Sequence, residues 1–387
     1  MARSKEVLAG GIRTSDLVSL GVLAQRISAS EVKAAVADSG RQSVRRRSLP
    51  AEMVVLLCMA LWLFRDVSYE DTLDCLIEAW RWLGLPGGDG ATKGAISQAR
   101  TRLGPEPMKI LFERLAVPLA TQDTKGAWYK GRRIVTMDAT LFETPDTTDN
   151  GKAFGYPSGA HGRGPFPRVR VMALSEASTH ACFACAIGSY TTSESKLCRQ
   201  FIGALTPNMI LLADRNFFGA KAWEQFDAAG AALLWRIQSN APVKLVQRLA
   251  DGSYLGKLTN TKSDFPVRII IYRLEGSEET VRLATNILDP DQAPAIELAR
   301  LYPERWEAEL VFDEIKSHIS ESRLALRSKK PELVEQEIWG LMLLHWALRD
   351  LMHEAAQAHA RDPDTISFVK TIRLVKLQMA KDGSFSP

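Results

Sequence analysis

The sequence predicts an α/β core built on a mixed sheet, preceded by a helical domain and interrupted by a β-rich insertion. Apolar residues recur every three or four positions from Ser15 to about Ala120, which is typical of helices. After Lys125 the spacing changes to short strand-like runs separated by helical patterns, the order of an α/β layer. Strand-like runs return over residues 231–288, and helices follow from Pro294. With 387 residues, of which 46% are hydrophobic, several structural units are expected.

The helical pattern near the N-terminus coincides with a concentration of basic charge. Residues 1–50 hold nine Lys or Arg against four Asp or Glu, whereas the whole chain has a net charge of only +4. Helix starts that present Ser, Gln and Arg are suited to reading DNA, so we expect residues 1–125 to form an all-α DNA-binding domain. A solvated helix face without a ligand is the alternative for the same charges. The candidate DNA contacts are Arg45, Arg46, Arg47, Lys93, Ser97, Gln98, Arg100 and Arg102.

The changes of spacing also divide the rest of the chain. Residues 126–230 are expected to form the first part of a catalytic domain and residues 291–358 its second part, with a β-rich insertion at 231–290. Residues 359–387 are expected to be a C-terminal tail. No stretch resembles a secretory signal, and the most apolar window, Ile338–Leu348, is too short to cross a bilayer. We therefore expect a cytoplasmic protein without a membrane partner, associated with the nucleoid when bound to DNA.

The five cysteines form an odd, irregular set, which suits a reducing compartment better than a disulfide framework. Cys182 and Cys185, with His180 nearby, invite a zinc interpretation. Positions i and i+3 of a strand point to opposite faces, however, and no second ligand pair completes the site. We therefore expect no zinc site here.

Two aspartates follow apolar runs that have the pattern of strands. Asp138 comes after Ile134–Met137, and Asp214 comes after Ile210–Ala213. The carboxyl ends of strands are where α/β proteins build their sites, so both side chains are candidates for catalysis. An Asp that closes a strand is also a common turn former, which is the alternative for either residue alone. The pair is a stronger indication than its members.

A third acidic candidate lies on a helix expected to begin near Pro303. Four side chains fall within an arc of about 60° if each residue turns the helix by about 100°: Tyr302, Arg305, Glu309 and Lys316. An exposed helix with ion pairs is the alternative. It would draw its charges from Glu304, Glu307, Asp313 and Glu314. Spacing alone does not choose among these five acids.

The spacing of those four side chains resembles the signature of the transposase family named after insertion sequence 4. Tyr, two residues, Arg, three residues, Glu, six residues and Lys follow as in that family, without gap or substitution. Other segments resemble the family in the same order, and the likeness covers most of residues 15–350. These segments are Arg45–Asp71, Ala95–Gly104, Ile134–Thr140 (IVTMDAT), Leu211–Phe217 (LLADRNF) and Leu324–Glu337 (LALRSKKPELVEQE).

This resemblance implies a DDE transposase with an RNase H-like catalytic core. In such a core Asp138, Asp214 and Glu309 would be catalytic residues that bind two Mg²⁺ ions, with Mn²⁺ as a substitute. The resemblance assigns Asp138 as the bridging ligand, and Asp214 and Glu309 as each completing the shell of one ion. It also equates the β-rich segment before Glu309 with the insertion of that fold.

The resemblance further implies contacts with the DNA end. Tyr302, Arg305 and Lys316 would hold it, and Arg215 is a further candidate phosphate contact. A packed helix face is the alternative for Tyr302 and Arg305. Members of the family use a Trp to engage a flipped base while a DNA hairpin forms. Trp235 is the candidate for that role, although its apolar neighbours allow a place in the core equally well.

By resemblance the reaction is cut and paste, through a hairpin intermediate, on double-stranded DNA with terminal inverted repeats. A homodimer in a DNA-bound synaptic complex would join the excised element to target DNA. Two alternatives remain: a transposase-derived protein that binds DNA without cutting it, and another RNase H-like nuclease. The complete set of acids favours chemistry, and the four-residue spacing disfavours a different nuclease. Family members usually continue past Lys381, so a truncated C-terminus is one interpretation of the short tail Asp382–Pro387.

Overall fold

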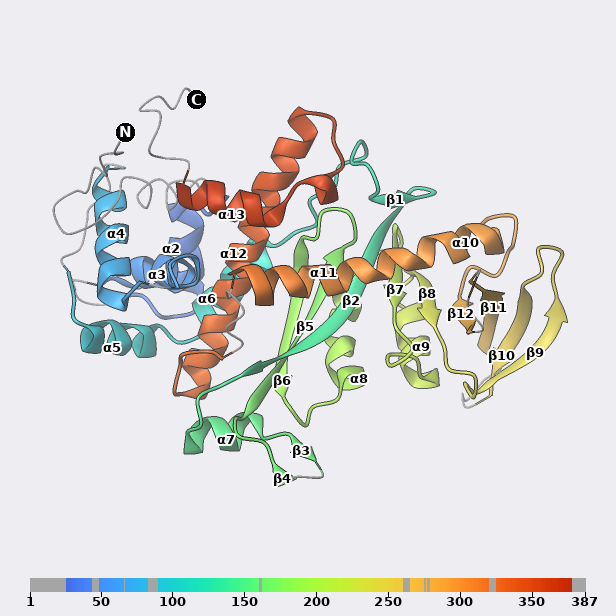
Figure 1. Ribbon diagram of the computed structural model, residues 1–387, viewed down its shortest axis with the longest axis horizontal. Coiled ribbons are helices and arrows are strands. Elements are labelled where there is room, and N and C mark those ends of the chain that lie inside the picture. The colour runs from blue at the N-terminus through green and yellow to red at the C-terminus, as the bar shows by residue number, and fades with distance from the viewer. Residues whose placement is uncertain are drawn as a thin grey trace. The chain divides into compact units, whose positions relative to one another are not determined.

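The computed structural model describes residues 26–43, 49–65, 67–82, 90–159, 162–259, 265–274, 276, 279–319 and 325–377 (Figure 1). The chain forms two compact units. Unit 1 comprises Met1–Val117, Glu143–Pro167 and Asp313–Pro387, and unit 2 comprises Pro118–Phe142 and Arg168–Phe312.

Unit 1 is largely helical. Its α-helices are α2 (Ala29–Asp38), α3 (Ala51–Leu63), α4 (Tyr69–Trp82), α5 (Lys93–Leu103), α6 (Glu106–Leu115), α7 (Thr148–Phe154), α12 (Pro331–Ala358) and α13 (Phe368–Leu377). It also holds the strands β3 (Ser158–Gly159) and β4 (Gly162–Arg163), the π-helical segment η3 (Glu314–Ile319) and the 3₁₀ turn η4 (Pro363–Thr365).

Helix α3 forms the centre of unit 1. It is apolar almost throughout and buried on all sides, because α2, α4, α5 and α12 pack around it. Gly340 stands where α12 meets α3. A Cβ at this position would lie only 2.9 Å from the carbonyl oxygen of Cys58, so the close approach of the two helices requires glycine.

Two C-terminal helices differ from the expected division. Helix α12, expected within the second part of the catalytic domain (291–358), packs against α3 and α6 in unit 1. The segment expected as a tail (359–387) contains η4 and α13. Phe368, Ile372 and Val375 of α13 are buried, and α13 packs on α12 and η3. Tertiary burial of this apolar stripe stabilises a helix of ten residues that would be marginal in isolation.

A buried imidazole in α12 makes unit 1 sensitive to acid. Burial lowers the pKa of His345 from 6.5 to about 3, although its Nε2 lies 3.0 Å from Oε2 of Glu314, which also pairs with Arg349. The folded state therefore favours the neutral form. Its contribution to stability is complete above pH 6.5 and is lost as the pH falls from 6.5 towards 3.

We expect the free energy of unfolding to fall by up to about 1.4 kcal/mol per pH unit in that window because of this one group. Urea unfolding at several pH values measures the slope, and His345→Gln is the control. The assignment to His345 is wrong if the variant, corrected for its overall stability loss, keeps the same slope.

Unit 2 contains one mixed sheet with helices on both faces. Its strands are β1 (Trp128–Tyr129), β2 (Arg132–Glu143, whose last residue belongs to unit 1), β5 (Arg168–Glu176), β6 (Cys182–Ser189), β7 (Met209–Ala213), β8 (Ala232–Arg236), β9 (Val243–Arg248), β10 (Tyr254–Leu258), β11 (Phe265–Arg273) and β12 (Thr280–Thr285). Its helical segments are α8 (Glu194–Leu197), η1 (Cys198–Ala204), α9 (Ala220–Asp227), α10 (Ala295–Leu301), η2 (Tyr302–Trp306) and α11 (Glu307–Asp313, whose last residue belongs to unit 1).

The sheet order is β6-β5-β2-β7-β8-β12-β11-β10-β9, with β1 paired to β2. The pairs β2/β7 and β7/β8 are parallel, whereas β5/β6 and the pairs from β8/β12 to β10/β9 are antiparallel. This mixed sheet flanked by helices confirms the predicted fold class and is consistent with an RNase H-like core. Strand β8, which we expected to open the insertion at residue 231, instead pairs with β7 in the parallel part of the sheet.

Side chains alternate between two cores on either side of the sheet. Odd-numbered strand residues such as Val135 and Leu211 form one core with the side chains of α8, η1 and α9. Phe201, Trp223 and Phe226 are the aromatic residues that these helical segments contribute. Even-numbered residues of the same strands form the second core, which includes residues of α10 and η2. Its members include Ile134, Ile210, Leu212, Leu234, Leu298, Leu301 and Tyr302. The even-numbered face is therefore the one that α10 and η2 cover.

Candidate active site

The parallel pair β2/β7 gives Asp138 and Asp214 equivalent positions. Thr136 pairs with Leu212, and each aspartate comes two residues later. We expected Asp138 to follow the end of its strand. It lies instead inside β2, beyond the residues that pair with β7. Alternation continues there, with Thr140 and Phe142 buried, so the strand does not end at Asp138. Both aspartates continue the even-numbered series that faces α10 and η2.

The helical segment that bears Glu309 is hydrogen-bonded to the end of β7. The hydroxyl of Tyr302 donates to the carbonyl oxygen of Ala213 at 3.3 Å, directly before Asp214. Burial raises the pKa of Tyr302, so the hydroxyl stays protonated and available as a donor. Tyr302 is only 7% exposed, which contradicts its predicted contact with DNA. Its bond to β7 instead places the following turn beside Asp214.

We expect Tyr302→Phe to remove this bond and leave the ring packed. The predicted cost is about 1 kcal/mol in the free energy of unfolding, with a further loss of cleavage rate if the turn moves away from Asp214. Chemical denaturation and a strand-cleavage assay measure the two effects. An unchanged cleavage rate would show that the hydroxyl has no positioning role.

Arg305 connects the three acids electrostatically. Its Nη2 donates to Oε1 of Glu309 at 2.8 Å, and its charge also acts on Asp138 and Asp214. Burial opposes the charge of Arg305, but the bond to Glu309 and the neighbouring negative groups raise its pKa, so it remains a cation. Arg305 is 8% exposed and Glu309 lies at the surface.

Burial makes the charged form of Asp138 unfavourable. Its pKa rises to about 6, chiefly through burial; the backbone N–H of Ala139 and the charge of Arg305 act against the rise, whereas Glu309 and Glu194 add to it. A carboxylate held in this way gains from a nearby cation. The oxygen donors of Asp138, Asp214 and Glu309 fit the ligand preference of Mg²⁺ and Mn²⁺.

The three acids do not form a preformed metal-binding cluster. In the part of the chain that the structure describes, no three Asp, Glu, His or Cys side chains lie together as a metal-ligand cluster. Oε1 of Glu309 accepts from Arg305, which leaves the second carboxylate oxygen, Oε2, outside this bond. The donor chemistry of the three predicted residues fits a divalent ion.

The segment from Tyr302 to Ile319 is not a uniform α-helix. It passes from the 3₁₀ turn η2 through α11 into the π-helical η3. The predicted arc assumed about 100° per residue throughout, which holds only within α11. Lys316 lies on η3, in unit 1. Arg215 is exposed directly after Asp214, where it is accessible to a phosphate.

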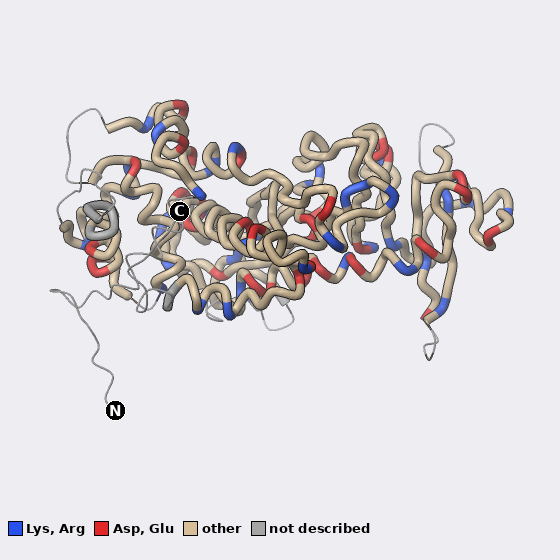
Figure 2. Tube along the Cα trace, turned by 90° about the horizontal axis from the view of Figure 1, so that it is seen from above, with Lys and Arg blue, Asp and Glu red and all other residues tan. Residues whose placement is uncertain are grey.

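The N-terminal candidates divide into three groups. Arg45, Arg46 and Arg47 lie outside the described residues. Exposed positions of α5 are held by Lys93, Ser97, Gln98 and Arg102, so these remain predicted DNA contacts. Lys/Arg and Asp/Glu positions are otherwise interspersed along the chain, which agrees with its small net charge (Figure 2).

Arg100 was wrongly expected to contact DNA. It is 4% exposed, and its Nε and Nη2 donate to Gln336 and Ser328 at 2.9 and 3.1 Å. Gln336 in turn donates to the carbonyl oxygens of Arg100 and Gly104. Arg100 therefore joins α5 to α12 inside unit 1.

Trp235 is likewise a core residue. It is completely buried and packs edge-on against Trp223 and Phe226, with ring centroids 5.4 and 5.2 Å away, so it cannot engage a base. Trp306 was not among the predicted site residues, yet it is 58% exposed and its ring lies against the guanidinium of Arg305. Its place one residue after Arg305 and three before Glu309 was the available signal.

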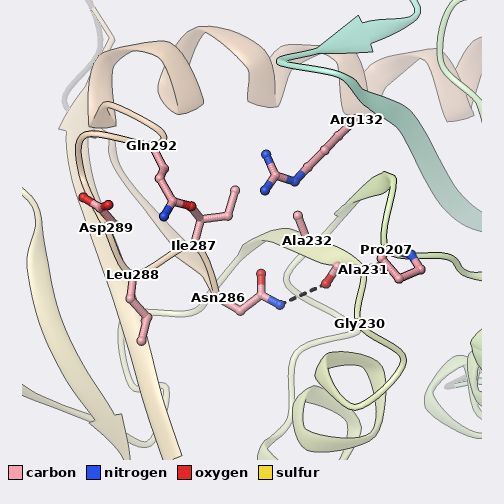
Figure 3. A pocket seen from close by; sticks show the side chains of 10 residues that line it. All are labelled: Arg132, Pro207, Gly230, Ala231, Ala232, Asn286, Ile287, Leu288, Asp289 and Gln292. Carbon is pink, nitrogen blue, oxygen red and sulfur yellow. Dashed lines mark hydrogen bonds between the residues drawn. The ribbon is translucent and has the colours of Figure 1, made fainter.

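A pocket of about 320 Å³ lies elsewhere in unit 2 (Figure 3). Arg132, Ala232 and Gln292 are among its lining residues, and the guanidinium of Arg132 extends into it. Arg132 and Ala232 begin their strands, whereas Asp138 and Asp214 come after the paired residues Thr136 and Leu212. The pocket is therefore at the opposite ends of the strands from the acids.

Comparison with known proteins connects this geometry to a family. A model of the insertion element 4 transposase N-terminal region matches residues 17–113, and one of the transposase DDE domain matches residues 129–347. Transposase InsG for insertion sequence element IS4 of Escherichia coli K12 is 30% identical over 367 residues, 90% of this chain and 80% of the relative. The chain belongs to the insertion sequence 4 family of DDE transposases.

Two further similarities are more distant. The putative transposase InsZ of Escherichia coli K12 is 24% identical to this transposase over 273 residues, 70% of this chain and 86% of the relative. A piggyBac transposase in a synaptic complex with hairpin DNA aligns with a TM-score of 0.48 and 12% identity, covering 93% of this chain and 80% of that one.

Membership of the family establishes the kind of protein. The transposase is an enzyme that cleaves and transfers DNA strands, depends on divalent metal ions and has DNA as its partner. Among the described residues, none of the helices combines the length and hydropathy needed to span a membrane.

Proposed function

We propose that the transposase moves an insertion sequence by cut and paste, with Asp138, Asp214 and Glu309 as the ligands of two Mg²⁺ ions that Mn²⁺ can replace. The supporting observation is the equal register of the two aspartates on the sheet face that the Glu309 segment covers. Three carboxylates suffice, because Mg²⁺ completes its shell with water and substrate phosphate. Held by these three side chains, divalent ions would supply activation of the attacking oxygen and stabilisation of the leaving one.

The acidic and basic side chains have separate roles in this proposal. Asp138 would be a ligand of both ions, because its burial makes its own negative charge unfavourable without a cation. Arg305 holds Glu309 and takes a DNA phosphate when Glu309 turns to the metal. Arg215 binds a further phosphate through its planar guanidinium, and Lys316 binds another through the charge of its ammonium group.

We further propose a hairpin route. Water attacks the phosphodiester at the element end and releases a 3′-hydroxyl, which then attacks the opposite strand and closes a hairpin. A second water reopens the hairpin, and the 3′-hydroxyl attacks target DNA, displacing a 3′-oxygen of the target. Trp306 replaces Trp235 as the aromatic that stacks on a flipped base, since it is exposed beside Arg305.

The partners proposed are double-stranded DNA with terminal inverted repeats, target DNA and a second copy of this chain in a synaptic complex. The exposed face of α5 supplies DNA contacts from the N-terminal region. We place the insertion at β9–β12, residues 243–285, because β8 pairs with β7. Binding to chromosomal DNA would keep the transposase at the nucleoid.

The test is strand cleavage of a labelled duplex that ends in the element's own terminal repeat. With Mg²⁺ or Mn²⁺, the expected products are a nick at the repeat end followed by a hairpin that migrates as a single strand of doubled length. Trp306→Ala should reduce hairpin formation more than the first nick. Double-strand breaks without a hairpin would overturn the hairpin route, and specific binding without cleavage would indicate a DNA-binding remnant.

A further inference from the structure

The turn between β5 and β6 holds a histidine in an unfavourable backbone conformation. His180 has φ 57°, and it is 3% exposed. Few residues other than Gly adopt the left-handed region, and His, Asn and Asp are the types enriched there. Asn or Gly would serve the turn equally well, so the contacts of the imidazole are what distinguish His180 from a residue that only forms the turn.

The imidazole contacts the segment that carries Glu309. Its Nε2 lies 2.7 Å from Oε2 of Glu307, the residue that opens α11. The His180 side chain is 4% exposed and that of Glu307 is 20% exposed, so the contact is largely shielded from water. Glu309 follows two residues later. The turn therefore holds the first residues of the helix on which Glu309 stands.

The same turn and the end of β5 are hydrogen-bonded to β2, the strand that carries Asp138. The N–H of Ala177 donates to the carbonyl oxygen of Ile134 at 3.1 Å, and the hydroxyls of Ser175 and Thr136 lie 3.0 Å apart. Thr136 is two residues before Asp138. A short chain of buried contacts thus leads from the strand of Asp138 through the turn to α11.

We propose that His180 and Glu307 form a positioning pair that sets the place of Glu309 relative to Asp138. The inference rests on the proposed role of Glu309 as a metal ligand. Tyr302 and Glu307 fix the segment at two points five residues apart, one on β7 and one on the β5–β6 turn. Loss of a side chain bonded directly to a metal ligand typically lowers metal affinity by about 10- to 100-fold, and this pair, which does not touch Glu309 itself, should have an effect at the lower end of that range.

The experiment follows Mn²⁺ rather than activity alone. Electron paramagnetic resonance measures Mn²⁺ bound to the DNA-free protein, and single-turnover cleavage measures the Mn²⁺ concentration for half-maximal rate. In His180→Asn, the new side chain accepts the backbone conformation but does not reach Glu307. The affinity for Mn²⁺ should fall about tenfold, and the Mn²⁺ concentration for half-maximal rate should rise about tenfold. The rate at saturating Mn²⁺ should change by less than about threefold, since the pair touches no reacting atom.

Two further changes separate positioning from folding. Glu307→Ala should lower the affinity for Mn²⁺ as much as His180→Asn does. The double variant should show no larger loss than either single variant, because each substitution removes the same contact. Glu307→Gln should be close to wild type, since an amide pairs with either imidazole tautomer. Ser178→Ala is the matched control: it removes the bond from the same turn to the carbonyl oxygen of Lys125 and should leave Mn²⁺ binding unchanged.

Additive losses in the double variant would overturn the inference, as would unchanged Mn²⁺ binding in His180→Asn and Glu307→Ala. An equal loss in Ser178→Ala would also overturn it, because the effect would then belong to the turn as a whole. Each of these outcomes presupposes a wild-type protein that binds Mn²⁺ through Glu309. If wild type and Glu309→Gln bind Mn²⁺ alike, the proposed function of Glu309 itself fails.

Discussion

Asp138→Asn is expected to abolish metal-dependent strand cleavage, by at least about a thousandfold. Metal ions supply several kcal/mol of charge stabilisation in the transition state, and each 1.4 kcal/mol corresponds to about a tenfold change in rate. An amide keeps the shape of the side chain but offers one oxygen without charge. Cleavage of the terminal-repeat duplex in Mg²⁺ measures the loss, and binding of the same duplex without metal should persist.

The same change should not destabilise the protein. Burial, together with the nearby charges of Glu309 and Glu194, raises the pKa of Asp138 to about 6, so the ionised carboxylate at pH 7 lowers the stability of the folded state. Removing that charge should leave the melting temperature unchanged or higher. Asp149→Asn, at an exposed position of α7, is the control and should alter neither property. Cleavage retained by Asp138→Asn would remove Asp138 from the site.

Arg268→Met is expected to cost about 3–5 kcal/mol of stability in unit 2. Arg268 is completely buried in β11. Its Nε donates to Ser253 at 2.8 Å, its Nη1 to the carbonyl oxygen of Ala293 at 2.7 Å, and its Nη2 pairs with Asp251. Asp251 also accepts the N–H of Ala295 at 2.8 Å, where α10 begins. Without the guanidinium, a carboxylate and a buried carbonyl group lose their partner.

Such a cost is a large part of the roughly 5–15 kcal/mol that stabilises a typical domain. Chemical denaturation measures it, and proteolysis should become faster around α10. Arg248→Met is the matched control, because Arg248 is exposed on β9, two strands away in the same sheet, and it should change stability by no more than about 0.5 kcal/mol. Equal effects of the two substitutions would contradict a structural role for the Arg268 contacts.

Local patterns explain which parts of the site were predictable. Apolar alternation in Ile134–Met137 and Ile210–Ala213 places two strands, and the acids follow at the same phase of each. Residue spacing also identified Arg305 and Glu309 as neighbours, which the structure joins by a hydrogen bond. These contacts lie within a few residues in sequence or follow from one strand period.

Burial was the property that local patterns failed to predict. Arg100, Trp235 and Tyr302 have side chains suited to binding DNA, yet each is enclosed by distant parts of the chain. The partner of Arg100 is 236 residues away, and the contact between Tyr302 and Ala213 spans 89. A residue is buried because several segments converge on it, and no single window of sequence contains that information.

The sequence by itself therefore determined the fold class and the family and predicted three acidic ligands, because strand period, helix period and motif spacing are local properties of the chain. Only the tertiary structure decided that Asp138 lies inside its strand, that α12 packs against α3 and α6, and that His180 meets Glu307 across 127 residues. Register and packing depend on which surfaces bury one another, and that choice is made by the whole folded chain.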